Sequence, residues 1–287
     1  MERNIIHCKN IDHEASLMVF DQEKFVGLII GKVWKESFVV SGYQDIGWIS
    51  LLYIIPEYRH RGIGTNLIKH VEDVFIKLNK KTIFLGKDPN NFFPGIPSEF
   101  QKYYQWFEKR GFILLRDTYD LMRTVDENSK PIELPSIRFD IDYLRKDTFL
   151  STIEFMNKNF PGRWSYELVD YISKGGTGKE YLIMQDRGRV IGFCRLNDAS
   201  TTIINYNMTW SALFDIPSGI GPLGIDQDYR KLQLGYFIVG FATNELIRKN
   251  VSNIVIDWTS LIAFYRKFGF EIWKTYRYAQ KNIQQLD

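Results

Sequence analysis

The sequence predicts an α/β (α+β) protein made of two tandem copies of one fold, and three observations support this prediction. The chain has 287 residues, enough for about two domains of ~150 residues each. Its composition, 45% hydrophobic and 25% charged, is typical of a globular protein and excludes a disordered chain. An internal repeat indicates that the two domains share one architecture.

The repeat consists of three matches that occur in the same order in both halves of the chain. The matching segments are 26–27 with 191–192, 57–64 (EYRHRGIG) with 228–235 (DYRKLQLG), and 109–112 (KRGF) with 267–270 (KFGF). The second match continues without a gap as far as Asn79 and Asn250, and the first copy then holds an insertion near residues 88–100. One such match arises easily by chance, but three in one order indicate a duplicated fold.

The first copy begins with a predicted β-hairpin and central strand. Apolar runs at 17–20 and 25–30 flank a four-residue polar turn, which is a hairpin signal. A nearly continuous apolar run at 48–55 ends at Pro56 and predicts a buried strand. From Thr65 onward the apolar residues follow helical spacing, so we expect an amphipathic helix there.

The remaining elements of the first copy are shorter. We expect a strand at 83–85, a helix at 98–110 that ends at Gly111, and two closing strands at 112–115 and 119–124. The polar segment 126–135 contains two prolines and is the predicted linker. The predicted domains are therefore 1–125 and 136–287.

The second copy has the same order of elements and two additional helices before its hairpin. Apolar spacing predicts these helices at 147–159 and 164–173, with Pro161-Gly162 between them. The first copy has too few residues before its hairpin to form such a pair.

The segment from Arg59 to Thr65 predicts an anion-binding turn between a buried strand and a helix. Gly62 and Gly64 allow a phosphate to approach backbone N–H groups, and the helix dipole places partial positive charge there. Arg59, His60 and Arg61 add side-chain donors, so the natural ligand is a pyrophosphate. The alternative is a basic turn that only caps the helix.

The pattern Pro56-x-x-Arg59-x-x-Gly62-x-Gly64 resembles the Arg/Gln-x-x-Gly-x-Gly/Ala signature of the GNAT acyltransferase superfamily. Segments 107–112 and 264–270 are similar to the later helix of that family, so nearly the whole chain resembles a tandem two-domain bacterial N-acetyltransferase. The resemblance implies two GNAT-like domains, each with a mixed, mostly antiparallel central sheet flanked by helices. It also implies acetyl-CoA as the cosubstrate.

The resemblance further implies roles for individual residues. Backbone near Leu52 and Ile54 would pair with the pantetheine arm, and an N–H near Ile54 would polarise the thioester carbonyl. The residues implied in binding acetyl-CoA are Leu52, Ile54, Arg59, His60, Arg61, Gly62, Ile63, Gly64, Thr65, Arg230 and Gly235. In the second copy Gln233 replaces the first glycine and Leu232 replaces an arginine, which weakens the expected turn there.

A tyrosine on the later helix of this family often protonates the leaving thiolate. The second copy has Tyr265 at that position, whereas the first has Phe107, so Tyr265 is a candidate catalytic residue and packing against the sheet is the alternative. Tyr103 and Tyr104 are alternative donors in the first copy. Three carboxylates are candidate bases that the sequence does not distinguish: Asp45, Glu99 and Asp257.

The predicted function is acetyl-CoA-dependent N-acetyl transfer to an amine of a small molecule or peptide. The alternative is a non-catalytic acyl-CoA-binding sensor or scaffold on the duplicated fold. We expect acetyl-CoA in the first copy, with the second domain or the loop at 92–97 completing the acceptor cleft. A net charge of +3, two distant cysteines and no metal-binding histidine spacing argue against nucleic acid and metal, and no apolar run is long enough for a membrane helix, so we expect a cytoplasmic protein.

Overall fold

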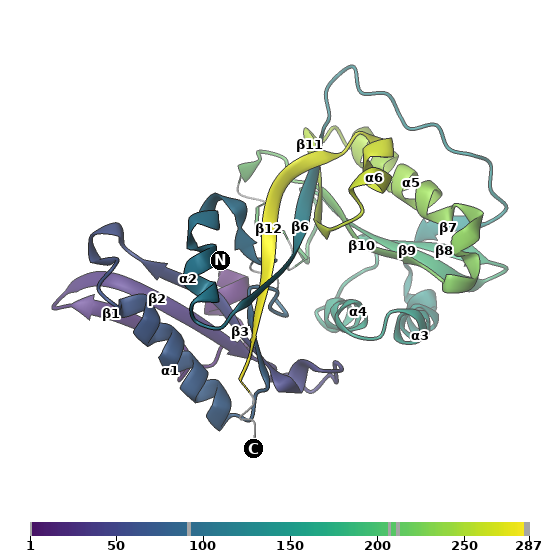
Figure 1. Ribbon diagram of the computed structural model, residues 1–287. Helices are drawn as coiled ribbons and strands as arrows, with labels where there is room; N and C mark the ends of the chain where they lie inside the picture. Colours follow the sequence, from purple (N-terminus) through teal and green to yellow (C-terminus); the bar gives the residue numbers. More distant parts are fainter. Residues whose placement is uncertain (1, 91–92, 206–207, 211–212, 284–287) are drawn as a thin grey trace. The chain divides into compact units, whose positions relative to one another are not determined.

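The computed structural model describes residues 2–90, 93–205, 208–210 and 213–283. The chain divides into two compact units (Figure 1). Unit 1 comprises Met1–Thr118 and Lys274–Asp287, and unit 2 comprises Tyr119–Trp273. Each unit contains one copy of the repeated strand–turn–helix.

Unit 1 is a sheet in the order β1-β2-β3-β4-β12, with one long helix packed against it. Its strands are β1 (Leu17–Asp21), β2 (Lys24–Val33), β3 (Ile46–Ile54), β4 (Thr82–Leu85), the short β5 (Ile96–Pro97), the first part of β6 (Ile113–Thr124) and most of β12 (Glu271–Asn282). Its helices are α1 (Ile63–Lys77) and α2 (Tyr104–Glu108). Strands β3 and β4 are parallel, while the pairs β1–β2, β2–β3 and β4–β12 are antiparallel.

Helix α1 buries one face on this sheet, which explains the apolar spacing in its sequence. The buried residues are Leu67, Ile68, Val71, Val74 and Phe75. The contact is close, because a Cβ on Gly47 of β3 would lie 2.4 Å from the Phe75 ring. The helix N-terminus is thereby held at the end of β3.

Unit 2 is a sheet in the order β6-β11-β10-β9-β8-β7, with helices on both faces (Figure 1). Its further strands are β7 (Asp140–Tyr143), β8 (Tyr181–Asp186), β9 (Arg189–Asn197), β10 (Gly219–Ile225) and β11 (Asn253–Thr259). Its helices are α3 (Phe149–Asn159), α4 (Arg163–Ser173), α5 (Leu234–Arg248) and α6 (Ile262–Tyr265). Strands β10 and β11 are parallel, while the pairs β6–β11, β9–β10, β8–β9 and β7–β8 are antiparallel.

The two additional helices predicted in the second copy cover one face of this sheet. Phe155 of α3 and Trp164 of α4 pack on Phe193 of β9, and α5 covers the opposite face (Figure 1). In unit 1, the described residues before β1 form only a short π-helical turn, Glu2–Ile6, in place of this helix pair. The predicted fold, mixed and mostly antiparallel with flanking helices, is confirmed.

Two details of the predicted elements were wrong. The expected closing strands at 112–115 and 119–124 form one strand, β6, which runs through the polar stretch between them, where the side chain of Asp117 pairs with that of Arg277 of β12 at 2.5 Å. The helix expected at 98–110 begins as a 3₁₀ helix over Ser98–Tyr103 and is α-helical only from Tyr104 to Glu108.

The compact units also divide elsewhere than at the predicted linker. Strand β12 is the last strand of the second copy in sequence, yet its residues pair with β4 and β5 of unit 1. Conversely, the end of β6, from Tyr119 to Thr124, pairs with β11 in unit 2. The predicted linker 126–135 is free of helix and strand. The division into 1–125 and 136–287 therefore stays a prediction about where each copy of the repeat begins and ends in the sequence.

Candidate active site

In unit 1, the turn after β3 is held by the first arginine of the motif. Arg59 donates from Nε to the carbonyl of Ile54 at 2.9 Å and from a guanidinium nitrogen to the Tyr103 hydroxyl at 3.0 Å. His60 and Arg61 are exposed, and the Arg61 guanidinium lies 4.8 Å from the centre of the Tyr58 ring. The turn therefore presents cationic side chains on a fixed backbone.

Gly62 precedes α1 and adopts the left-handed conformation, with φ of 82°. A Cβ at this position would have no atom within 4 Å, so the space beside it is open. No side chain caps the N-terminus of α1. The N–H groups at Ile63, Gly64 and Thr65 therefore form an uncapped helix end, which suits a phosphate.

Beside this turn lies Arg110, which was not among the residues predicted from the sequence to form the site. Its guanidinium stacks on Trp106 at 3.6 Å from the ring centre and donates to the Thr65 hydroxyl at 2.5 and 3.2 Å. The same Trp106 ring would lie 3.3 Å from a Cβ on Gly64. The position of Arg110, just before the matched Gly-Phe pair, was visible in the sequence. The contact of Arg110 with Thr65, however, depends on how α2 packs.

Strand β3 separates from β4 where the pantetheine arm was expected. The two strands pair only from Ile46 to Ile49, whereas β3 stays paired with β2 as far as Ile54. Ser50 forms a β-bulge at the point of separation, and its buried hydroxyl has no partner among the described residues. The half-buried Leu52 and Ile54 thus lie on a strand with one open backbone edge.

Unit 2 repeats this arrangement. Strands β10 and β11 pair only at Gly219 and Val255, and a bulge interrupts the pairing of β10 with β9 between Ile220 and Leu223. Arg230 donates from Nε to the carbonyl of Ile225 at 3.4 Å. Gln233 takes the place of the first glycine and adopts φ of 57°, so the turn keeps its left-handed step.

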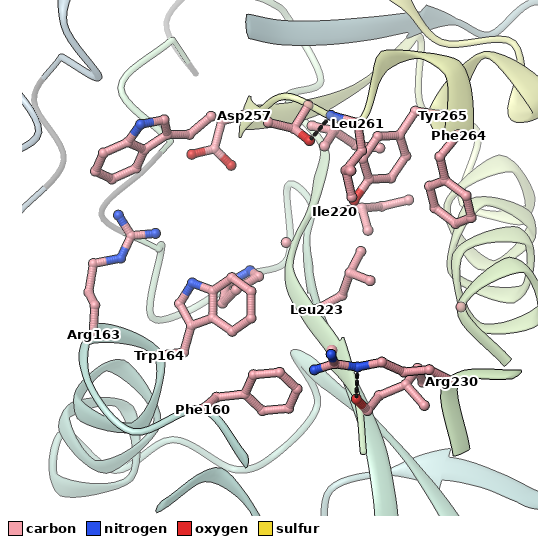
Figure 2. A pocket seen from close by; sticks show the side chains of 18 residues that line it. Phe160, Arg163, Trp164, Ile220, Leu223, Arg230, Asp257, Leu261, Phe264 and Tyr265 are labelled. Atoms are coloured by element: carbon pink, nitrogen blue, oxygen red, sulfur yellow. Dashed lines mark hydrogen bonds between the residues drawn. The ribbon is translucent and has the colours of Figure 1, made fainter. Parts of the chain in front are cut away.

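A pocket of about 390 Å³ opens where β10 and β11 separate (Figure 2). Its lining includes Arg230 and Gly235 of the turn region and Phe264 and Tyr265 of α6. Figure 2 shows Asp257 and Arg163 on the side away from Arg230. One cavity in unit 2 thus joins the turn, the open strand edge and the candidate proton donor.

Tyr265 is 5% exposed and lines this pocket. Burial raises its pKa above the usual range, and the Cys194 thiol and the Asp257 carboxylate add to this. Its hydroxyl makes no hydrogen bond with the described part of the chain, and Figure 2 shows the ring reaching towards Ile220. The phenol is therefore protonated at neutral pH and available to donate.

The alternative donors in unit 1 lie differently. Tyr104 is half-buried, burial raises its pKa, and the Arg277 guanidinium lies 5.6 Å from its ring centre. Tyr103 accepts from Arg59. Phe107 packs edge-on against Trp106 and Phe112 and offers no hydroxyl.

Of the three candidate bases, only Asp257 lines the pocket. Asp45 is half-exposed and pairs with Lys81 at 3.2 Å, and Glu99 is exposed, both in unit 1. Phe92, in the loop expected to help close the acceptor cleft, lies outside the described residues. In the part of the chain that the structure describes, no three His, Cys, Asp or Glu side chains gather to hold a metal ion, and no helix has the length and apolar character to cross a membrane.

Comparison with known proteins agrees with this geometry. Residues 1–93 match the sequence profile of the Acetyltransferase (GNAT) family, whereas no curated protein sequence matches the chain. Among solved structures, a GCN5-related glucosamine N-acetyltransferase region of a fungal multi-domain GH3 β-N-acetylglucosaminidase has a TM-score of 0.81 at 22% identity. The match covers 98% of this chain but only 36% of that protein.

Two further structures match at comparable coverage of both chains. A GCN5-related N-acetyltransferase from Sphaerobacter thermophilus has a TM-score of 0.69 at 16% identity, covering 94% of this chain and 81% of that one. A tandem GNAT protein from the clavulanic acid biosynthesis pathway has a TM-score of 0.59 at 13% identity, covering 95% and 85%. At these identities the likeness concerns the fold.

Proposed function

We propose that this chain, a tandem GNAT-fold protein, is an acetyl-CoA-dependent N-acetyltransferase whose transfer reaction takes place in the pocket of unit 2. One observation carries the proposal. The pocket brings together Arg230 of the turn, the open edge of β10 and the protonated Tyr265 hydroxyl. The acceptor is an amine of a small molecule or peptide.

The open strand and the turn suit the two parts of acetyl-CoA. The pantetheine amides pair with β10 where β11 has separated, as an added strand would. Backbone N–H groups on that edge polarise the thioester carbonyl and stabilise negative charge on its oxygen. Arg230 and the start of α5 near Gly235 bind the diphosphate.

The chemistry requires two proton movements. The acceptor amine must be neutral before it attacks the thioester carbon. When the C–S bond breaks, the sulfur takes the proton of the Tyr265 hydroxyl. Burial keeps this hydroxyl protonated, so it acts as an acid throughout the neutral range.

Unit 1 is a second acetyl-CoA site in this proposal. Its turn has both glycines, an uncapped α1 and the added Arg110, but Phe107 provides no proton at the position of Tyr265. We therefore assign diphosphate binding to Arg59–Thr65 without transfer. The hypothesis of a non-catalytic acyl-CoA-binding sensor is thus kept for unit 1 only.

The test compares Tyr265→Phe with Tyr104→Phe. In an assay of CoA thiol release with a panel of amines, Tyr265→Phe lowers kcat about 10²-fold while acetyl-CoA affinity is retained. Tyr104→Phe leaves kcat unchanged. Unchanged turnover in Tyr265→Phe would assign Tyr265 to packing, and CoA binding without release for any amine would favour a sensor.

A further inference from the structure

The described lining of the pocket in unit 2 contains two cationic side chains, Arg230 and Arg163. Arg230 belongs to the turn and binds the diphosphate in the proposed function. Arg163 is the first residue of α4, and Figure 2 shows its side chain next to Trp164 on the side of the pocket away from Arg230. The second cation therefore lies where the acceptor, rather than acetyl-CoA, would bind.

The guanidinium of Arg163 has a defined place at this end of the pocket. It lies 4.3 Å from the centre of the Trp258 ring, which is a cation–π contact. Its Nε lies 3.0 Å from the carboxylate of Glu167, one helical turn further along α4. The Arg163 side chain is 17% exposed, so water screens its charge only in part. An anion in this pocket would therefore interact strongly with Arg163 once Glu167 no longer neutralises it.

Glu167 holds Arg163 by charge rather than by an aligned hydrogen bond. Its carboxylate is buried, and neither oxygen accepts a hydrogen bond from the described part of the chain. Burial raises the pKa of Glu167, and the positive charges of Arg163 and Arg195 oppose this shift. The buried carboxylate thus needs a cation, and each of the two arginines can supply one.

Arg195, on β9, is the second of these arginines and is itself buried. Its Nη atoms donate to the Tyr181 hydroxyl at 3.3 Å and to the carbonyl of Ile203 at 2.7 Å. Its buried Nε–H has no acceptor among the described residues. Because an unpaired buried donor is costly, this N–H favours a carboxylate that turns towards it. Glu167 therefore has an alternative cationic partner when it leaves Arg163.

We propose that Arg163 binds a carboxylate group carried by the amine acceptor, and that Glu167 turns from Arg163 to Arg195 when this group arrives. This inference rests on the proposed transfer in unit 2. The planar guanidinium donates two parallel hydrogen bonds to a carboxylate, which suits arginine to this group. The buried charges stay paired throughout, because Glu167 exchanges one arginine for the other. The acceptor class is an amine that also bears an acidic group, as a free amino acid does.

The negative charge of Asp257, which also lines the pocket, limits which anions fit. A ligand that is only anionic would be repelled by this carboxylate. The ammonium group of an amino acid offsets that repulsion, so a zwitterion fits better than a simple carboxylic acid. Phe160 and Trp164, with ring centres 5.3 Å apart, add an apolar wall that suits an apolar side chain on the acceptor.

The first experiment measures CoA release with acceptors that differ only in the acidic group. The pairs are phenylalanine with phenylalanine amide and lysine with lysine amide, and phosphoethanolamine with ethanolamine tests a phosphate in place of the carboxylate. We expect kcat/KM for each amino acid to exceed that for its amide about tenfold. Equal values within both amino-acid pairs overturn the inference, and so does a preference for phosphoethanolamine over both amino acids.

The second experiment compares Arg163→Gln with Arg145→Gln, which alters an exposed arginine of the same unit. Arg163→Gln lowers kcat/KM for phenylalanine about tenfold and leaves that for its amide unchanged, because only the carboxylate loses a partner. Arg163→Lys recovers part of the loss, and Arg145→Gln changes neither value. Equal losses for the acid and the amide in Arg163→Gln would assign Arg163 to packing on Trp258 and contradict the carboxylate site.

Glu167→Gln tests the exchange of partners. It removes the negative charge that competes for Arg163, so KM for phenylalanine falls about fivefold while kcat and the KM for the amide stay unchanged. A purely structural role for Glu167 would raise both KM values. That result, or a higher KM for phenylalanine alone, contradicts the exchange.

Calorimetry separates failure of this inference from failure of the proposed transfer. Phenylalanine or its amide is titrated into the CoA-saturated protein and into its Arg163→Gln variant. Tighter binding of the acid that is lost in the variant supports the carboxylate site, even when no amine releases CoA and the proposed transfer alone fails. Equal binding of the acid and the amide overturns the inference, whatever the turnover.

Discussion

In both units the first arginine of the turn donates from Nε to the last residue of the preceding strand, Arg59 to Ile54 and Arg230 to Ile225. The tyrosine that precedes this arginine also donates from its hydroxyl to an aspartate of the hairpin. Tyr58 donates to Asp21 at 2.7 Å in unit 1, and Tyr229 donates to Asp186 at 3.0 Å in unit 2. The left-handed step also recurs, with Gly62 in one turn and Gln233 in the other. The same arginine and tyrosine side-chain contacts thus recur in both turns, even where the first glycine is replaced.

The surroundings of the two turns differ. In unit 1, Thr65 and Arg110 form a polar contact beside the helix end. The matching residues in unit 2, Tyr236 and Phe268, stack with ring centres 4.7 Å apart. Unit 1 therefore adds a cation where a phosphate would bind, whereas unit 2 adds apolar packing beside its pocket.

The largest expected difference concerns the matched positions Phe268 and Arg110. Phe268 is 2% exposed in the core of unit 2, so Phe268→Ala should destabilise unit 2 by about 3–5 kcal/mol. Arg110→Ala should cost at most about 1 kcal/mol, because its guanidinium is partly solvated. Hydrogen exchange in each unit, measured against urea concentration, would check this. Equal losses of stability in the two variants would contradict this difference between the matched positions.

The second difference concerns phosphate binding at Gly64 and Gly235. Gly64→Val places a branched side chain within 3.3 Å of Trp106 and over the helix end, so it should cost about 2–4 kcal/mol of acetyl-CoA binding in unit 1. Turnover should remain. Gly235→Val should leave this tighter site intact and reduce turnover instead.

Calorimetry and CoA release on these two variants separate the units. We expect two binding events in the unaltered protein and loss of the tighter one in Gly64→Val. If Gly64→Val binds normally while Gly235→Val removes the tighter site, the assignment of tight binding to unit 1 is wrong.

The third difference is sensitivity to alkaline pH. Burial raises the pKa of Tyr181 to about 12, and the matching residue of unit 1 is Ser16. The pKa of this tyrosine in the unfolded chain is ~10, so the unfolded chain ionises at a lower pH than the folded protein. The folded state is therefore stabilised fully below pH 10, and about 3 kcal/mol of its free energy of unfolding is lost as the pH rises from 10 to 12. Amides of β8 and β9 should therefore lose protection before those of β1 and β2. Tyr181→Phe should reduce the effect, and an unaltered pH dependence in that variant would exclude this cause.

The smallest expected difference is the conformational cost of Gln233. A residue with a Cβ at φ of 57° is less favourable than glycine by about 1–2 kcal/mol, so Gln233→Gly should stabilise unit 2 by up to that amount and tighten acetyl-CoA binding there. Gly62→Gln is the reciprocal change and should lower both the stability of unit 1 and its affinity for acetyl-CoA. A loss of binding in Gln233→Gly would show that the Gln233 amide contacts the ligand.

Much of the fold could be predicted from local patterns. The hairpin, the buried strand before Pro56, the amphipathic α1 and the helix pair α3–α4 all appear close to the expected residues. Each depends on periodicity or on a turn signal within about 15 residues. The GNAT-like motif likewise identified the turn at Arg59, because its chemistry requires adjacent residues.

Parts of the candidate site could not be predicted in this way. The sequence did not distinguish Asp257 from the two other carboxylates that were candidate bases. It also did not identify Trp258 or Arg110 as residues of the site. Asp257 lies over Gly221, and Trp258 takes its strained backbone, only because β10 and β11 separate there. These positions depend on residues that are far apart in the chain.

The sequence by itself determined the duplicated architecture, the two turns and the unequal glycines and tyrosines of the copies. The tertiary structure alone decided which strand completes which sheet, since β12 pairs with β4 in unit 1 and the end of β6 pairs with β11 in unit 2. The reason is physical: apolar alternation specifies that a segment is a strand and which face it buries. Its partner is selected by backbone hydrogen bonds and packing across the whole chain, and local sequence does not encode that choice.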